Sequence, residues 1–220
     1  MGKCYDAVVF DLDGTLLDTL RDLTDSTNAA LACYGMPQQS IEEIRGFVGN
    51  GIRRLIQKAV PGGEDNPDFL QVYDEFKTHY DKHCMDVTEP YPGVLLLLTE
   101  LHKLGVRMAI VSNKADFAVK KLSRVYFDEL IEVAVGEREG CRRKPEPDSV
   151  LQALKELGVP RERAVYVGDS EVDILTEKNA GIDSIIVTWG FRSRDYLLAQ
   201  GANPERMAAN VNELLAYLRR

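Results

Sequence analysis

The sequence lacks the patterns that mark several common classes of protein. Its four cysteines, Cys4, Cys33, Cys84 and Cys141, have no CxxC spacing, so no zinc or redox motif is indicated and reduced thiols are expected. The longest apolar run, residues 94–98, is far too short to span a bilayer. The first ten residues contain no long apolar segment of a secretory signal. We therefore expect a soluble, cytoplasmic protein with no membrane partner.

A surplus of basic residues is also missing. The chain has 27 Lys and Arg against 35 Asp and Glu, a formal net charge of -8, with no basic stripe. This balance argues against a nucleic-acid partner. An anionic substrate would need a local cation or an anion-binding loop. The 220 residues, 45% of them hydrophobic, suffice for the core of one domain, or one domain with an insertion.

Several well-known ligand-binding motifs fail on spacing. There is no P-loop, and an EF-hand fails because Gly14 comes too soon after Asp11 and Asp13. A dinucleotide fingerprint fails because Arg54 stands where a third glycine is needed. His79 and His83, four residues apart on a helical pattern, have no third ligand nearby and are expected to be solvated.

Short apolar runs alternate with helical patterns through most of the chain. The runs are rich in β-branched residues, as buried parallel strands are; they cover residues 6–10, 106–112, 131–135, 164–168 and 184–189. Helical apolar faces lie between or after them, over residues 94–104, 150–157 and 207–218. This alternation predicts an α/β fold, a Rossmann-like parallel sheet with helices on both faces.

Residues 19–88 break this alternation. Helical patterns cover residues 20–34, 41–48 and 69–80, and no strand-like run appears among them. We therefore predict a small all-helical cap domain, residues 19–88, inserted after the first strand. The catalytic core would comprise residues 1–18 and 89–220.

Polar residues cluster where the predicted strands end. Asp11 and Asp13 follow the first strand, Ser112, Asn113 and Lys114 follow the second, and Asp169 and Asp173 follow the fourth; Lys144 precedes the helix that leads to the fourth. Taken singly, each cluster fits a turn, a helix cap or a surface loop. Ligands bind outside the carboxyl ends of strands in open parallel sheets, so together the clusters predict one site.

The clustered acids predict a divalent cation. Asp11, Asp13 and Asp169 would share one edge, with Asp173 in or just outside the coordination shell. Two unit charges about 4 Å apart interact by about 4 kcal/mol at an effective dielectric constant near 20, so repelling carboxylates need compensation. Mg²⁺, which prefers oxygen ligands, together with Lys144 would provide it.

The same residues suit phosphoryl transfer. Asp11 could attack phosphorus to form an aspartyl-phosphate, and Asp13 could protonate the leaving oxygen and then activate water. Ser112, Asn113 and Lys144 would hold the phosphoryl oxygens. Gly14 would let the backbone around Thr15 turn tightly enough for its N–H groups to face the phosphate.

Four motifs in this order, "DLDGTLLDT", "SNK", "KPEP" and "GDSEVD", resemble those of the haloacid dehalogenase-like phosphatase superfamily. The chain is similar over essentially its whole length to the phosphoglycolate phosphatase group. The resemblance implies Asp11 as nucleophile and Asp13 as acid/base and, through its carbonyl, metal ligand. It also implies Asp169 as metal ligand and Ser112 and Lys144 as phosphate holders. Dehalogenases proper lack the second aspartate, so Asp13 favours phosphoryl transfer.

The segment "GNGIRR" has two interpretations. It can be a turn between two helices, or Gly51 can open a helix whose free N–H groups, with Arg53 or Arg54, bind a substrate anion. The resemblance favours the second, since cap loops of these phosphatases close over the site and select the leaving group. A small phosphorylated metabolite is the expected partner, with 2-phosphoglycolate first.

The same residues are also compatible with other activities. A mutase of the β-phosphoglucomutase type shares the fold and nucleophile, and a pyrophosphatase is a further relative. A phosphonoacetaldehyde hydrolase would need a cap lysine, and residues 41–56 contain none. A non-enzymatic binding module is disfavoured by the intact Asp11, Asp13, Lys144 and Asp169. The oligomeric state is expected to be monomer or homodimer.

Overall fold

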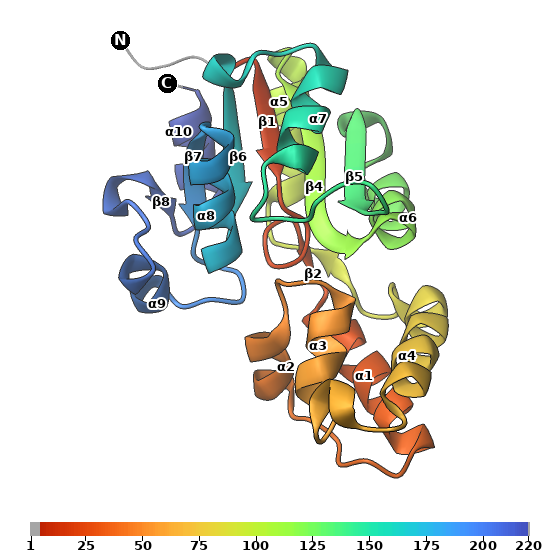
Figure 1. Ribbon diagram of the computed structural model, residues 1–220. Coiled ribbons are helices and arrows are strands. Elements are labelled where there is room, and N and C mark those ends of the chain that lie inside the picture. Colours follow the sequence, from red (N-terminus) through yellow and green to blue (C-terminus); the bar gives the residue numbers. More distant parts are fainter. Residues whose placement is uncertain (1–4, 220) are drawn as a thin grey trace. The chain divides into compact units, whose positions relative to one another are not determined.

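The computed structural model describes residues 5–219, which divide into two compact units (Figure 1). One unit comprises the chain through Leu17 together with the chain from Pro90 onward, and the other is Asp18–Glu89. The expected division, with an insertion at residues 19–88, differs by one residue at each boundary. Cys4 lies outside the described residues. None of the helices within residues 5–219 is long and apolar enough to cross a membrane.

The first unit is built on a six-stranded parallel sheet. Its strand order is β5-β4-β1-β6-β7-β8, in which β1 lies between two strands, β4 and β6, that do not follow it directly in the chain (Figure 1). The strands are β1 (Ala7–Phe10), β4 (Arg107–Ala115), β5 (Val133–Glu137), β6 (Ala164–Gly168), β7 (Asp183–Val187) and β8 (Met207–Ala208). All four residues of β1 are fully buried, as a central strand covered on both faces requires.

Helices cover both faces of this sheet, as predicted. The apolar stripe of α7 (Asp148–Leu157), which includes Val150 and Leu154, packs on Val9 of β1 and Val111 of β4. Other helices that contact the strands are α5 (Val94–Lys103), α6 (Asp116–Phe127), α8 (Glu171–Ala180) and α10 (Val211–Leu218); a shorter one is α9 (Arg194–Ala199). The sheet and its helices therefore form a packed core, and polar turns lie at the ends of the strands.

α6, α8 and α9 were not among the predicted helices, and two further assignments in the first unit were wrong. Met207 lies in β8, paired with Ile186, and not in the last helix, which begins at Val211. β4 continues to Ala115, so Ser112 to Lys114 form the end of the strand and do not follow it. A two-residue strand such as β8 is too short to show a periodic pattern. The polar residues at the end of β4 resemble those of a turn.

The second unit is helical and contains four helices where three were predicted. They are α1 (Leu20–Cys33), α2 (Ile41–Phe47), α3 (Ile52–Ala59) and α4 (Phe69–His83). Gly51 is the residue that precedes α3. In this unit the buried Asp22 carboxylate accepts hydrogen bonds from the Thr88 N–H (2.9 Å) and hydroxyl (2.7 Å), which fastens the end of the insertion to its first helix. The segments that join the two units, β2 (Leu17–Asp18) and β3 (Glu89–Pro90), pair as short strands.

Candidate active site

The turn after β1 carries the first pair of acids. The Asp11 N–H still donates to the Val167 carbonyl of β6 (2.8 Å), so Asp11 is held at the end of the sheet. Gly14 has φ +85°, and a Cβ built there would lie 2.4 Å from Asp169 Oδ2. Only glycine can therefore occupy this turn while Asp169 stays where it is.

Lys144 joins the acids of two different strand ends. Its Nζ lies 2.9 Å from Asp11 Oδ1, 2.9 Å from Asp173 Oδ1 and 2.8 Å from the Tyr166 hydroxyl. The Lys144 side chain is 2% exposed, that of Asp173 0% and that of Asp11 11%. This is a buried charge network in which one cation faces two carboxylates, so the charges do not balance among these three residues.

Asp173 uses both of its oxygens for hydrogen bonds within the protein. Its Oδ2 accepts from the Ser170 hydroxyl (2.6 Å), the Ser170 N–H (3.0 Å) and the Asp169 N–H (3.2 Å). Its Oδ1 accepts from the Tyr166 hydroxyl (2.7 Å) and from Lys144. Five donors occupy the carboxylate, so its geometry is that of an anchor for Lys144 and for the turn that carries Asp169.

Asp169 is oriented from two other segments. Its Oδ1 accepts from the Thr15 hydroxyl (3.0 Å), and its Oδ2 accepts from the Phe191 N–H (2.8 Å). Thr15, predicted near the phosphate, thus has its side chain on Asp169. Gly190 permits this packing, because a Cβ there would lie 2.3 Å from both Asp169 Oδ2 and the Gly14 carbonyl oxygen.

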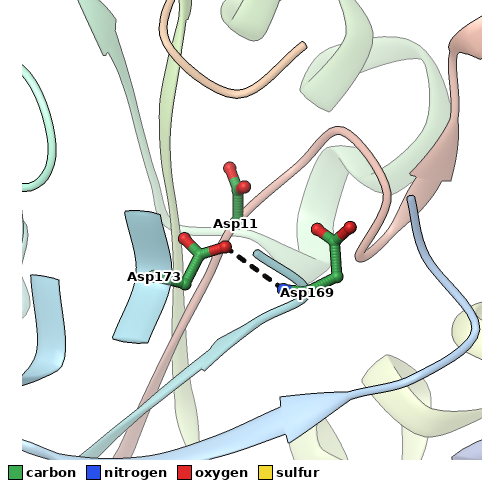
Figure 2. A group of neighbouring side chains, drawn as sticks. All are labelled: Asp11, Asp169 and Asp173. Atoms are coloured by element: carbon green, nitrogen blue, oxygen red, sulfur yellow. Dashed lines mark hydrogen bonds between the residues drawn. The ribbon is translucent and has the colours of Figure 1, made fainter. Parts of the chain in front are cut away.

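Asp11, Asp169 and Asp173 form the group of acids in residues 5–219 that could hold a metal ion, with one oxygen of each within 4.8 Å of the others. Figure 2 shows the three carboxylates together, with the Asp169 N–H donating to Asp173. Each Asp169 oxygen accepts one hydrogen bond, which leaves a lone pair toward a cation. The buried all-oxygen donor set fits Mg²⁺, with Asp11 and Asp169 better placed than the saturated Asp173 to bind it.

The pKa values report the same shortage of positive charge. Burial raises the pKa of Asp11 to about 7, although Lys144 acts in the opposite direction. Burial, and then the charges of Asp173 and Asp11, raise the pKa of Asp169 well above its usual range. For Asp173, burial would raise the pKa, but Lys144 and Ser170 outweigh it and lower the value. A bound divalent cation would stabilise the charged forms of Asp11 and Asp169 and so lower their pKa values.

Asp13 has a lysine of its own. Lys114 Nζ lies 2.8 Å from Asp13 Oδ1 and 3.1 Å from Oδ2, and the two side chains are only 2% and 12% exposed. The sequence analysis gave Lys114 no role. The signal that could have found it is a lysine at the end of an otherwise apolar strand, where burial demands an anionic partner.

Asn113 connects the second motif to the third, and Ser112 contacts Lys114 within the second motif. The Ser112 hydroxyl oxygen accepts from the Lys114 N–H (3.3 Å), and the Asn113 side-chain amide donates to the Lys144 carbonyl (2.9 Å). Both residues are buried, with 6% and 5% exposure. The Asn113 side-chain nitrogen thus positions the Lys144 segment.

The contacts of Tyr166 and Phe191 with the acids were also not predicted from the sequence. Tyr166 lies within the apolar strand β6, and only the fold shows that its hydroxyl reaches Asp173. Phe191 acts through its backbone N–H, which every residue but proline carries, so no sequence signal exists for it.

The predicted substrate-binding residues of the helical unit differ in the contacts that they make. Gly51, with φ +80°, precedes α3. Arg53 is paired with Glu64 (2.9 Å) and lies over the Phe69 ring, 5.2 Å from its centroid. Arg54 is exposed and donates to the nearby Gln57 side chain.

The two histidines of α4 are engaged separately and are not fully solvated as predicted. His79 Nδ1 lies 3.0 Å from the Ser26 hydroxyl, and His83 Nδ1 lies 2.8 Å from Asp86 Oδ2. Their rings stack with centroids 4.2 Å apart. Both side chains are partly buried, so contacts inside the helical unit explain them.

Comparison with known proteins identifies a family and several relatives of this chain. The family model described as haloacid dehalogenase-like hydrolase matches residues 8–187. Phosphoglycolate phosphatase 1 of Pseudomonas aeruginosa is 34% identical over 215 residues, covering 94% of this chain and 78% of the relative. The N-acetylmuramic acid 6-phosphate phosphatase of the same organism is 33% identical over 186 residues, covering 84% and 82%.

A solved structure is similar over nearly the full length of both chains. It is that of a candidate phosphoglycolate phosphatase from Lactobacillus delbrueckii subsp. bulgaricus, with a TM-score of 0.92 and 35% identity. The alignment covers 98% of this chain and 99% of that one. The two relatives and this structure thus share a fold, while the two relatives carry different substrate names.

Proposed function

The chain belongs to the haloacid dehalogenase-like hydrolase family and is a phosphatase of that family, and we propose that it hydrolyses small phosphomonoesters through an aspartyl-phosphate on Asp11. The first candidate substrate is 2-phosphoglycolate, since the Pseudomonas aeruginosa relative carries that activity in its name. The observation that supports the proposal is the placement of Asp11. It is buried at the carboxyl end of the central strand, beside Lys144 and two residues before a second acid.

In the first half of the reaction, an oxygen of Asp11 attacks phosphorus while the bond from phosphorus to the leaving oxygen breaks. Lys144 and the Ser112 hydroxyl hold the phosphoryl oxygens and stabilise the charge that develops on them. The carboxylic acid form of Asp13 gives its proton to the leaving oxygen, so the alcohol departs neutral.

In the second half, water attacks the phosphorus of the aspartyl-phosphate. Asp13, now a carboxylate, takes a proton from that water, and the Asp11–phosphorus bond breaks with its electron pair returning to Asp11. Inorganic phosphate leaves, and Asp13 again carries the proton that the next cycle needs. Water in and alcohol and phosphate out balance the reaction.

Asp11 and Asp169, with the Asp13 carbonyl, would hold the Mg²⁺ that the family uses. When bound, it supplies positive charge that lets an anionic carboxylate approach an anionic phosphate. Asp173 acts on this site from outside, because its five hydrogen bonds anchor Lys144 and the Asp169 turn.

The choice of leaving group falls to the helical unit, which we propose to be a cap. The residues of the catalytic unit address the phosphoryl group, which every phosphomonoester carries. A carboxylate on the leaving group needs its own cation, and Arg54 is better suited than Arg53, which is already held by Glu64 and Phe69.

The test is a set of initial rates with Mg²⁺. The panel contains 2-phosphoglycolate, N-acetylmuramic acid 6-phosphate, glucose 1-phosphate and pyrophosphate, and the Asp11→Asn variant is the control for contaminating phosphatases. We expect turnover of phosphomonoesters that stops in excess EDTA and is absent in Asp11→Asn. Release of no phosphate from any ester, or full activity with EDTA, would overturn the proposal; conversion of β-glucose 1-phosphate to an isomer without phosphate release would favour the mutase.

A further inference from the structure

We infer that Lys114 is a positioning residue that holds the Asp13 carboxylate as the base for hydrolysis of the aspartyl-phosphate. The inference rests on the proposed function and adds a residue to it. The ion pair that carries it lies within one unit of the fold, between the turn after β1 and the end of β4.

The pair is a contact between one ammonium group and both oxygens of the Asp13 carboxyl group. Lys114 Nζ contacts both Asp13 oxygens, at 2.8 and 3.1 Å. With the Lys114 side chain 2% exposed and that of Asp13 12% exposed, little water competes for the contact. Contacts to both oxygens restrict rotation of the carboxylate more than a single hydrogen bond would.

The two acids of the turn therefore have separate lysines. Lys144 lies against Asp11, and Lys114 lies against Asp13. Lys144 comes from the segment tied to β4 through Asn113, whereas Lys114 is part of β4 itself. The nucleophile and the acid/base thus each have an ammonium group of their own, and both ammonium groups are connected to β4.

This arrangement favours the second half of the reaction over the first. There, Asp13 must accept a proton from water as the water oxygen bonds to phosphorus and the Asp11 oxygen leaves. Lys114 contacts both Asp13 oxygens, so the carboxylate that accepts that proton is held in one orientation. With a leaving group that departs without a proton, the first half does not depend on Asp13. Loss of Lys114 should therefore slow breakdown of the phosphoenzyme more than its formation.

Lys114→Met tests this, with Lys114→Arg as the conservative variant. Lys103→Met is the matched control, since it removes an exposed lysine that pairs with Glu100 in the same unit. The probe is p-nitrophenyl phosphate, whose leaving group departs without a proton. Steady-state rates, the pre-steady-state burst of p-nitrophenolate and acid-quenched phosphoenzyme are measured with saturating Mg²⁺.

We expect kcat and KM of Lys114→Met to fall together, by about tenfold or more, with kcat/KM within about threefold of wild type; this is part of the effect usual for an acid–base group. A burst close to one product per active site and accumulated phosphoenzyme should accompany the fall. Lys114→Arg should restore most of kcat, and Lys103→Met should behave as wild type.

Two results would overturn the inference. A loss of kcat/KM with kcat unchanged would make Lys114 a phosphate-binding residue. Unchanged kinetics would give the pair no role in turnover. If Lys114→Met does not fold, as judged by thermal unfolding, the same measurements on Lys114→Gln decide. Failure of the proposed function looks different, because wild type itself would then show no phosphate release that depends on Asp11.

Discussion

The ammonium of Lys144 lies 2.9 Å from Asp11 Oδ1, and neither side chain is more than 11% exposed. The same ammonium is 2.9 Å from Asp173. Burial alone would lower the pKa of Lys144, but the two carboxylates outweigh it and raise the value, so the lysine stays charged. The stability of Asp11 and Asp173 at this end of the sheet therefore depends on the buried Lys144.

Lys144→Met should destabilise the protein, because it leaves two buried carboxylates without their cation. We expect the free energy of unfolding to fall by about 3–5 kcal/mol, the usual cost of removing one partner of a buried ion pair. Urea unfolding in EDTA measures it. Lys155→Met, an exposed lysine of α7, is the control and should change stability by less than about 0.5 kcal/mol. Equal stabilities of the two variants would contradict the account of the network.

Gly190 should control metal affinity without touching the metal. A Cβ at Gly190 would lie 2.3 Å from Asp169 Oδ2, so Gly190→Ala must displace that carboxylate or the loop that donates the Phe191 N–H to it. Disturbing such a supporting contact typically costs about 10–100-fold in metal affinity. We expect the Mg²⁺ concentration for half-maximal activity, and for half-maximal thermal stabilisation, to rise by that factor.

Gly46→Ala is the control for this experiment. Gly46 lies in α2, and nothing stands within 4 Å of the position that its Cβ would occupy. Its Mg²⁺ dependence should equal that of wild type. The same Mg²⁺ dependence in Gly190→Ala would show that the loop yields without moving Asp169.

Glu177 should make stability depend on pH. Burial raises its pKa to about 7; Lys178 and Arg206 oppose this, and Asp183 and Asp173 add to it. In the unfolded chain a glutamate has a pKa of about 4.3. Because the folded state holds the proton more tightly, Glu177 contributes stability below about pH 4 that is lost as the pH rises to about 7 and does not change further above it.

Glu177→Gln removes this dependence. We expect the variant and wild type to differ little at pH 4 and the variant to be more stable at pH 8, as measured by urea unfolding at both values. Glu156→Gln, at an exposed position of α7, serves as control and should show no such divergence. A variant less stable than wild type at pH 8 would mean that ionised Glu177 is favourably paired.

The fold could be predicted from the sequence because the central strands of the sheet are buried on both faces. The runs that became β1 and β6 are apolar throughout, and the alternation with helical stripes predicted the parallel sheet. β8 could not be predicted, because Met207 and Ala208 are too few to show a pattern and are placed by pairing with β7. α3 was recognised only as an alternative, since Gly51 fits a turn as well as a helix start.

The candidate site was predictable where one rule sufficed. Strand ends of a parallel sheet meet at one edge, and this brought Asp11, Lys144 and Asp169 together in the prediction. The pairing of Asp13 with Lys114 depends on how the turn after β1 meets β4, which spacing does not reveal. Gly190 and Phe191 act through a missing Cβ and a backbone N–H, and neither appears as a chemical signal in a sequence.

The two arginines after Gly51 should behave differently, although the sequence treats them alike. Arg53 is exposed, but it is held by Glu64 and lies over Phe69, so its contacts stabilise the helical unit. Arg54 is exposed, and its described contact is with Gln57 on the same helix. Arg54 can therefore exchange that contact for a substrate carboxylate without disturbing the fold.

Arg54→Ala should lower kcat/KM for 2-phosphoglycolate by about 10- to 100-fold, because a hydrogen bond to a charged group is worth about 1.5–3 kcal/mol and about 1.4 kcal/mol is a factor of ten. p-Nitrophenyl phosphate, which has no carboxylate, should lose no more than about threefold. Arg53→Ala, the matched control one residue away, should affect both substrates equally and lower the thermal stability. Equal losses in Arg54→Ala would assign Arg54 to the general action of the helical unit, and no loss with either substrate would leave "GNGIRR" as a turn between two helices.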